Sequence, residues 1–235
     1  MADLTTILID QKEELGEMET GGLVPRKEEE LVNLKSNVAQ VVIGVRRSGK
    51  STVCKRVILQ SGLPFGYINF DDERLDGIDA EGLDELLKTL YRINGEFRIL
   101  FLDEAQNVKG WHKFVNRMLR IGMKVVLTGS NANLLSSDLT TYLTGRYNEI
   151  SLYPFSFAEF CRAKGVSVTS ASTKGQALRQ RALDEYMTSG GLPEVVMNGE
   201  GKGYVMSLLN ATEQEEFRIR CRSALDGLET LLQSL

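Results

Sequence analysis

The chain has 235 residues, of which 42% are hydrophobic and 26% charged, as is ordinary for a globular protein large enough to bury one good core. Its formal net charge of −4 disfavours a strongly basic nucleic-acid binder, although a local basic face would still fit. No run of about 18 apolar residues is present to span a membrane, and the N-terminus lacks the basic start of a signal peptide.

Strands and helices alternate over the larger part of the chain. A leading helix is expected within residues 1–24, and a charged segment that becomes helical runs from Pro25 to Lys35. Apolar runs predict strands at residues 38–45, 65–70, 98–102, 124–128 and 147–152, and helical periodicity predicts helices between them at 50–60, 83–93 and 111–121. This alternation predicts an α/β fold with a mostly parallel five-stranded sheet flanked by helices.

The pattern changes at Pro154, after which only helices are expected. They are predicted at residues 156–164 and 176–189, with a loop rich in Ser, Thr and Gly at 166–175 between them. The chain is therefore divided into an N-terminal helical lead-in (1–35), an α/β domain (36–153), a small helical lid (154–197) and a tail (198–235) with a polar helix at 213–232.

A phosphate-binding loop is predicted between the first strand and the helix that follows it. The segment Gly44–Ser51, GVRRSGKS, fits G-x-x-x-x-G-K-[ST] in the required strand–loop–helix context. Its glycines let backbone N–H groups close around phosphate oxygens, while Lys50 would reach the β- and γ-phosphates and Ser51 would bind Mg²⁺. The expected nucleotide contacts are Gly44, Arg46, Arg47, Ser48, Gly49, Lys50, Ser51 and Thr52. Arg46 and Arg47 have two alternative roles, contact with phosphate or with a neighbouring acidic segment.

The third predicted strand ends in two acids, Asp103 and Glu104. In a doubly wound sheet this end lies on the same edge as the phosphate loop, so Asp103 is expected to hold Mg²⁺ and Glu104 to orient or deprotonate the attacking water. The chain has no N-K-x-D motif of a GTPase, and a small-molecule kinase would direct its acids to the acceptor. A carboxylate beside the magnesium ligand favours an ATPase.

Two further positions could serve the same site. Thr128 and Ser130 end the fourth predicted strand, where their hydroxyls could sense the γ-phosphate, although strand-end capping explains them too. Arg146 precedes the fifth strand and could act as an arginine finger on a neighbouring subunit's nucleotide, or be a surface arginine.

Several segments together resemble a known family. They are Gly44–Thr52 (GVRRSGKST), Phe101–Trp111 (FLDEAQNVKGW), Leu127–Leu135 (LTGSNANLL) and Leu143–Phe160 (LTGRYNEISLYPFSFAEF). In this order they are similar to the AAA+-superfamily ATPases of bacteria and archaea that are grouped as archaeal-type ATPases. Gly190–Glu194 (GGLPE) is similar to the GGxPE element of that family, and the resemblance covers residues 20–197.

This resemblance implies a P-loop AAA+-type ATPase domain that uses ATP and Mg²⁺. It implies a Walker A motif at Gly44–Ser51, a Walker B motif at Asp103 and Glu104, a sensor at Ser130 and an arginine finger at Arg146.

The resemblance also implies features around the site. Asn69 falls where some AAA+ proteins carry a polar residue that restrains the catalytic glutamate, and the GGLP turn would lie in the lid near the adenine. Members of the family usually continue into a C-terminal domain of nuclease-like fold, so this chain, which stops at Leu235, is expected to be shortened.

The leading hypothesis is an Mg²⁺-dependent ATPase in which hydrolysis moves the helical part against the α/β core. The alternative is a nucleotide-dependent switch or partner-binding module without significant hydrolysis. An arginine finger in trans would require a homo-oligomer. Nucleic acid stays open as a partner because Lys113, Arg117, Arg120 and Lys124 could form one basic face, but a solvated helix face is the simpler explanation. Widely spaced cysteines and a single histidine disfavour a zinc site and fit a reducing cytoplasm.

Overall fold

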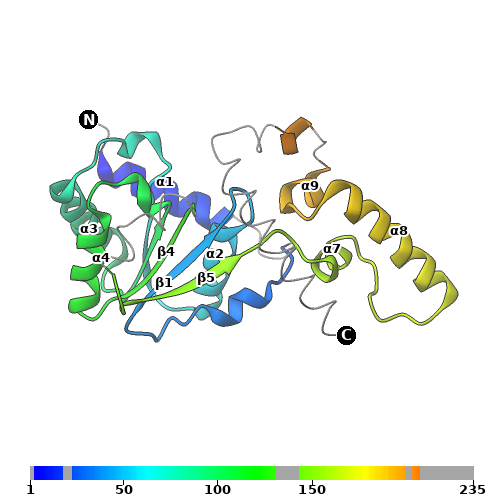
Figure 1. The fold of residues 1–235 in the computed structure, drawn as a ribbon. Helices are drawn as coiled ribbons and strands as arrows, with labels where there is room; N and C mark the ends of the chain where they lie inside the picture. Colours follow the sequence, from blue (N-terminus) through cyan, green and yellow to red (C-terminus); the bar gives the residue numbers. More distant parts are fainter. Residues whose placement is uncertain (1–2, 18–22, 131–142, 200–202, 207–235) are drawn as a thin grey trace. The chain divides into compact units, whose positions relative to one another are not determined.

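The structure of the chain is a computed structural model that describes residues 3–17, 23–130, 143–199 and 203–206 (Figure 1). Contacts divide the chain into two compact units, one formed by residues 1–44 and 48–153 and the other by residues 45–47 and 154–235. The helix predicted at 213–232 lies outside the described residues, as does most of the predicted tail at 198–235.

The first unit contains a five-stranded sheet with the strand order β2-β3-β4-β1-β5. Its strands are β1 (Ala39–Gly44), β2 (Phe65–Asn69), β3 (Ile99–Asp103), β4 (Lys124–Ser130) and β5 (Tyr147–Leu152). Every neighbouring pair is parallel, so the carboxyl ends of all the strands lie at one edge of the sheet. The predicted α/β class and the parallel five-stranded sheet are confirmed.

Helices cover both faces of this sheet (Figure 1). They are α1 (Leu4–Glu17), α2 (Lys50–Ser61), α3 (Ala80–Asn94) and α4 (Trp111–Arg120). Successive strand residues point to opposite faces, so Leu100 and Leu102 of β3 belong to the core shared with α3 and α4, while Phe101 belongs to the core shared with α2. Burial on both faces explains why the strands are continuously apolar runs.

Helix α1 crosses the edge of the sheet beside β2. Leu8 packs into the core with α3, and Leu15 packs into the core with α2. Between them, the buried Gln11 side chain pairs with the edge strand: its Nε2 donates to the carbonyl of Asn69 at 3.0 Å, and its Oε1 accepts from the N–H of Asn69 at 2.9 Å. Gln11 therefore supplies a hydrogen-bond partner that an edge strand would otherwise lack.

Three 3₁₀ turns connect these elements: η2 (Lys27–Leu31), η3 (Glu73–Leu75) and η4 (Ala105–Asn107). The helix expected within residues 25–35 is limited to the five residues of η2, because Val32 is already extended, with φ −77° and ψ 103°. The turn η4 directly follows the acidic end of β3 and is important for the site described below.

The second unit is helical, with α7 (Phe157–Ala163), α8 (Thr173–Ser189) and α9 (Pro193–Asn198). Helix α8 begins within the predicted loop 166–175, because the Ser172 hydroxyl caps it by accepting from the N–H of Gly175 at 3.0 Å. The GGLPE segment forms the connection from α8 to α9. Gly190 has φ 76°, and a Cβ on Gly191 would lie 2.2 Å from the carbonyl oxygen of Phe155, so both positions favour glycine.

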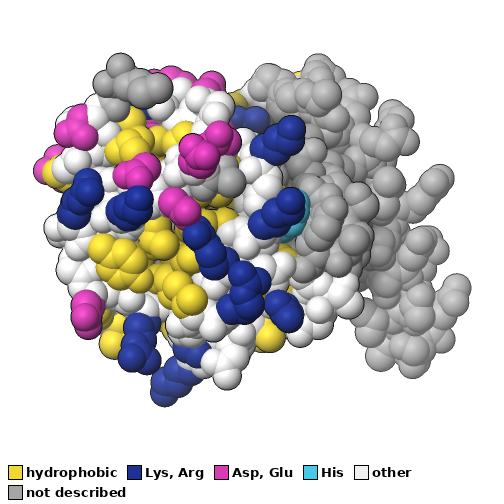
Figure 2. Space-filling view, turned by 90° about the vertical axis from the view of Figure 1, so that its left-hand side faces the viewer, with side chains coloured by type: hydrophobic (Ala, Val, Ile, Leu, Met, Phe, Trp, Pro, Cys, Tyr) yellow, Lys and Arg dark blue, Asp and Glu magenta, His cyan; other side chains and the backbone are white. Residues whose placement is uncertain are grey.

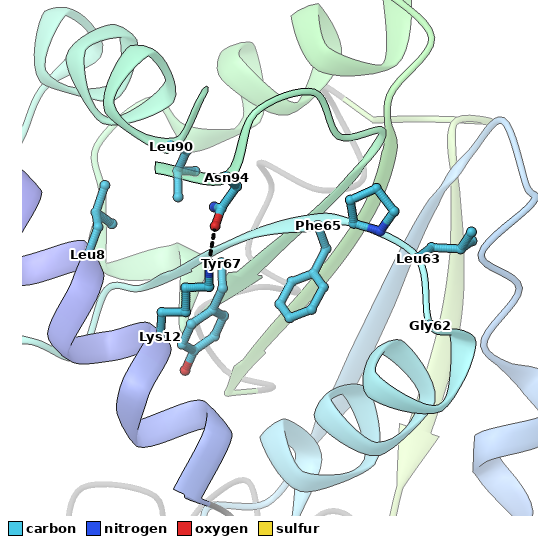
Figure 3. A pocket seen from close by; sticks show the side chains of 9 residues that line it. Leu8, Lys12, Gly62, Leu63, Phe65, Tyr67, Leu90 and Asn94 are labelled. Atoms are coloured by element: carbon cyan, nitrogen blue, oxygen red, sulfur yellow. Dashed lines mark hydrogen bonds between the residues drawn. The ribbon is translucent and has the colours of Figure 1, made fainter. Parts of the chain in front are cut away.

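No helix in the described part of the chain is long and apolar enough to cross a membrane. A cavity of about 330 Å³ opens between α1 and the amino-terminal part of β2 (Figure 3). Leu8 and Lys12 line it from α1, Phe65 lines it from the start of β2, and Lys12 Nζ donates to Oδ1 of Asn94 at 2.6 Å. Because Phe65 begins its strand, this cavity lies away from the carboxyl edge of the sheet.

Candidate functional site

The carboxyl edge of the sheet brings together motifs that are distant in the sequence. Gly44 at the end of β1 pairs with the backbone of Ser130 at the end of β4. Leu102 pairs with Leu127, which places Asp103 at the end of β3 beside Thr128. In a parallel sheet the carboxyl ends of all strands lie at one edge. Here that edge brings together the phosphate loop after β1, the acid pair at the end of β3 and Thr128 near the end of β4.

The phosphate loop shows why glycine is needed at both of its ends. A Cβ on Gly44 would lie 2.1 Å from the carbonyl oxygen of Leu152. Gly49 has φ 92°, which favours glycine, and it provides no side-chain cap for α2. The first backbone N–H groups of α2 therefore face out of the helix end, as in an anion site. Ser48 is fully buried, and its Oγ has no hydrogen-bond partner among the residues that the structure describes.

Asp103 is buried, at 4% exposure, and accepts hydrogen bonds from hydroxyl groups on three elements. Ser51 of α2 donates to its Oδ1 at 2.7 Å, and Thr128 of β4 donates to the same oxygen. Tyr67 of β2 donates to Oδ2 at 3.3 Å. Burial, and then the negative charge of Asp103, raises the pKa of the Tyr67 hydroxyl above its ordinary value, so Tyr67 remains a donor. Both carboxylate oxygens of Asp103 are therefore held by hydroxyl donors.

Lys50 and Glu104 lie beside this carboxylate. Lys50 Nζ donates to the carbonyl of Gly44 at 3.1 Å and lies 4.0 Å from Oε1 of Glu104. Glu104 adopts a left-handed conformation, with φ 52° and ψ 46°, and its N–H donates to Oγ1 of Thr128 at 3.1 Å. Because a left-handed residue turns the chain out of the strand, the Glu104 carboxylate reaches the phosphate-loop lysine instead of continuing along the sheet edge.

Gln106 lies in the segment Phe101–Trp111 but was given no role from the sequence, and among the described residues it makes the shorter of two contacts with this glutamate carboxylate. Its Nε2 donates to Oε2 of Glu104 at 2.6 Å. Asn69, which was expected to restrain the glutamate, uses its side-chain oxygen to accept from the N–H of Asp71 at 3.0 Å. The available signal in the sequence is the position of Gln106, two residues after the acid pair and inside a tight turn.

Arg26 is buried, and no motif in the sequence pointed to it. Its Nη1 donates to the carbonyl of Ser48 at 3.3 Å, and its Nη2 donates to the carbonyl of Tyr153 at 2.7 Å. Its Nε also lies 3.7 Å from a carboxylate oxygen of Glu28, which is itself buried. Arg26 thereby joins the phosphate loop to the residue after β5.

Arg146 lies at the opposite edge of the sheet from the phosphate loop. Its carbonyl accepts from the N–H of Ala39, the first residue of β1, and its exposed side chain donates to Oδ1 of Asn116 at 3.1 Å. The length of β1 separates this point from Gly44, roughly 16 Å at about 3.3 Å per residue. An arginine side chain cannot bridge that distance, so Arg146 cannot serve the site of its own subunit.

The two arginines of the loop belong to the second unit in the division of contacts. Arg47 has φ 66°, and its Nη1 donates to Oε1 of Glu194 at 2.6 Å, while the Tyr204 hydroxyl donates to the other oxygen of Glu194. Of the two roles considered for Arg47, the structure shows contact with an acidic segment, the GGLPE glutamate. Arg46 is exposed, and Thr52 is half-buried in the first turn of α2.

The basic face that was considered as the alternative to a solvated helix face is interrupted by other contacts. Arg117 pairs with Asp84, and Lys124 donates to the side-chain oxygen of Asn37. Figure 2 shows the side of the molecule where α3 and α4 lie, with basic, acidic and hydrophobic side chains intermixed among the described residues. On this side of the described residues, the distribution is that of a mixed surface.

Comparisons with known proteins bear on this arrangement. Residues 36–161 match a protein-family model described as an AAA domain. An uncharacterized protein of Methanocaldococcus jannaschii is 38% identical over 168 residues, and one of Haemophilus influenzae is 37% identical over 181 residues. These matches cover 71% and 73% of this chain but 38% and 44% of those proteins, so the chain spans about two fifths of the length of these relatives.

The chain is also similar to solved structures. A Walker-type ATPase of Pyrococcus abyssi has a TM-score of 0.45 at 18% identity, with 89% of this chain and 80% of that chain covered. The flagellar accessory protein FlaH of Methanocaldococcus jannaschii has a TM-score of 0.37 at 14% identity, with 57% and 80% covered.

Proposed function

Because the chain belongs to the family of AAA domains, we propose that it binds ATP with Mg²⁺ and hydrolyses it. The observation that carries this proposal is the hydrogen bond from Ser51 to Asp103, 2.7 Å long, with Lys50 4.0 Å from Glu104 beside it. These residues supply a phosphate ligand, two oxygen ligands for a divalent cation and a carboxylate to direct water, which are the parts that ATP hydrolysis needs.

The chain binds phosphate with fixed donors. The open end of α2, after Gly49, presents backbone N–H groups and the positive end of the helix dipole. Lys50 adds a full positive charge and is nearly buried, at 5% exposure, where a charge acts more strongly than in water. The buried Ser48 Oγ, which has no hydrogen-bond partner in the described part of the chain, fits a further polar contact in the same cradle.

Magnesium fits the oxygen atoms at the end of β3. The Ser51 hydroxyl and the Asp103 carboxylate are hard oxygen ligands of the kind that Mg²⁺ takes in nucleotide sites, together with phosphate oxygens. When bound, Mg²⁺ would neutralise charge that develops on the phosphate oxygens. Thr128 and Tyr67 donate hydrogen bonds to the Asp103 carboxylate from the strands of the sheet. The carboxylate would therefore keep its orientation if the Ser51 hydroxyl became a ligand of Mg²⁺.

Glu104 accepts the proton from the attacking water or orients it. Its carboxylate is partly exposed, at 24%, so water reaches it, and its backbone is held by Thr128. Lys50 turns from Glu104 to the phosphates when nucleotide binds, which leaves Glu104 available for water.

The finer assignments complete the proposal. Ser130, whose side chain is outside what the structure describes, senses the γ-phosphate, and Arg46, Arg47 and Thr52 contribute to the nucleotide contacts. Arg146 acts only in trans, so its role as a finger requires a homo-oligomer. Hydrolysis changes the conformation of the helical segment. Within the AAA domains, the chain is a member of the archaeal-type ATPases. The free, buried thiols of Cys54 and Cys161 accord with a reducing cytoplasm.

Steady-state phosphate release from Mg·ATP tests this function. Lys50→Ala should weaken ATP binding, and Glu104→Gln should keep ATP binding, with turnover falling about a hundredfold or more in each. The exposed residues Lys109 and Glu73 provide matched controls, since Lys109→Ala and Glu73→Gln should keep wild-type turnover. Wild-type protein that binds ATP through Lys50 and releases no phosphate would contradict the hydrolytic function.

A nucleotide-dependent switch is the second candidate, and the contact of Arg47 with Glu194 favours it. A phosphate that attracts Arg47 competes with Glu194, so nucleotide binding would release the GGLPE segment and the start of α9. Hydrogen exchange of Pro193–Asn198 should then rise when ATP is added to Glu104→Gln protein. The same addition to a Glu104→Gln/Arg47→Met protein should leave that exchange unchanged.

A further inference from the structure

Among the residues that the structure describes, the carboxylate of Glu104 has two partners of different kinds. Lys50 lies 4.0 Å from Oε1, and Gln106 donates to Oε2 at 2.6 Å. The contact with Lys50 is long, and Lys50 is also proposed to bind phosphate. The glutamine contact is short and involves a neutral amide that phosphate does not attract. Of these two contacts, the Gln106 contact is therefore the one that nucleotide binding does not compete for.

Backbone geometry directs Gln106 to this position. The left-handed conformation of Glu104 turns the chain into η4, and Gln106 is the middle residue of that turn. The Thr128 hydroxyl holds the N–H of Glu104 at 3.1 Å and so fixes where the turn begins. A non-glycine residue with positive φ is strained, and such strain persists where surrounding contacts hold it.

The other end of the Gln106 amide also points to a role in the site. Its Oε1 is buried and has no hydrogen-bond partner among the residues that the structure describes. A buried acceptor without a donor costs free energy, so its retention favours a function. Because Nε2 is directed to Glu104, Oε1 is oriented as an acceptor beside the same carboxylate.

We propose that Gln106 is the positioning residue of Glu104: its amide holds the catalytic carboxylate in place during ATP hydrolysis. This inference rests on the proposed ATPase function. It gives Gln106 the task that the family resemblance assigned to Asn69, whose side-chain oxygen is occupied by the N–H of Asp71.

The test compares Gln106→Met with wild type. Methionine keeps the length of the side chain and removes the donor. Turnover should fall about tenfold to a hundredfold, as expected for the loss of a hydrogen bond to a charged group, while the Kd for ATP stays within about threefold. Gln60→Met, at an exposed position of α2, should match wild type.

A double-mutant cycle separates positioning from a general structural effect. Gln106→Met in the Glu104→Gln background should cause no further loss of turnover, because the carboxylate through which Gln106 acts is gone. Wild-type turnover in Gln106→Met, faster turnover, or an equal further loss in the Glu104→Gln background would overturn the inference alone. Absence of turnover in the wild type would overturn the ATPase function and this inference with it.

Discussion

Ser51 and Asp103 are 52 positions apart in the chain, and the hydroxyl of the first donates to Oδ1 of the second at 2.7 Å. Ser51 lies in the first turn of α2 and Asp103 ends β3. The contact therefore depends on α2 beginning at the same edge of the sheet at which β3 ends. The pair is the point where the phosphate loop meets the acidic strand end, and it leads to the first prediction.

Removal of the divalent cation should abolish turnover. EDTA should stop phosphate release, and Asp103→Asn should lower kcat about a hundredfold or more, because several kcal/mol of charge stabilisation are lost. Asp76→Asn, at an exposed carboxylate, is the control. Phosphate release that persists in EDTA, or an Asp103→Asn rate close to wild type, would show that Asp103 holds no metal.

Arg26 should be important for stability. Arg26→Met removes the donors to the Ser48 and Tyr153 carbonyls and leaves the buried Glu28 without its nearby cation. The free energy of unfolding should fall by about 3–5 kcal/mol, the usual cost of breaking a buried charge pair on one side. Urea denaturation measures it, with the exposed Lys27→Met as control. If the free energy of unfolding falls no more in Arg26→Met than in Lys27→Met, Arg26 does not stabilise the phosphate loop.

Gln11 should hold the edge of the sheet. Gln11→Ala removes the two hydrogen bonds to the backbone of Asn69 and exposes that strand to water. We expect a loss of about 2 kcal/mol in the free energy of unfolding and faster hydrogen exchange at the Asn69 amide. Glu13→Ala, on the exposed side of the same helix, should change neither quantity. Unchanged exchange at Asn69 in Gln11→Ala would contradict this role.

Asp72 should make stability depend on pH at acid values. The hydrogen bond from Arg74 lowers the pKa of Asp72 from 3.8 to about 2, and Gln11 also donates to this carboxylate. Since the folded-state pKa is depressed, the stabilisation is complete above the unfolded value of 3.8 and is lost as pH falls toward 2.

The free energy of unfolding, measured by urea denaturation between about pH 5 and pH 2, tests this dependence, because this range includes the ordinary pKa of Asp72, 3.8, and its folded-state pKa of about 2. Asp72→Asn should be less stable than wild type at pH 5 and should show a flatter decline over this range, because one titrating group is removed. Parallel curves for the two proteins would show that Asp72 is not linked to folding.

Much of the site was predictable because its parts are local signals. The loop from Gly44 to Ser51 is recognised by spacing alone, and the acids Asp103 and Glu104 follow an apolar strand directly. Parallel topology then requires these strand ends to meet. Arg146 is different: the register with Ala39 places it at the amino-terminal edge of the sheet, so its role as a finger on a neighbouring subunit's nucleotide stays a prediction.

The sequence by itself determined the parallel α/β sheet and the phosphate and acid motifs, because apolar periodicity and strand–loop–helix patterns depend on neighbouring residues. Only the tertiary structure decided which polar side chains support them. Gln11 meets Asn69 across 58 positions and Arg26 meets Tyr153 across 127, and such partners depend on how the whole chain packs. Gln106 is near Glu104 in sequence, but its contact depends on a left-handed backbone that Thr128, on another strand, holds in place.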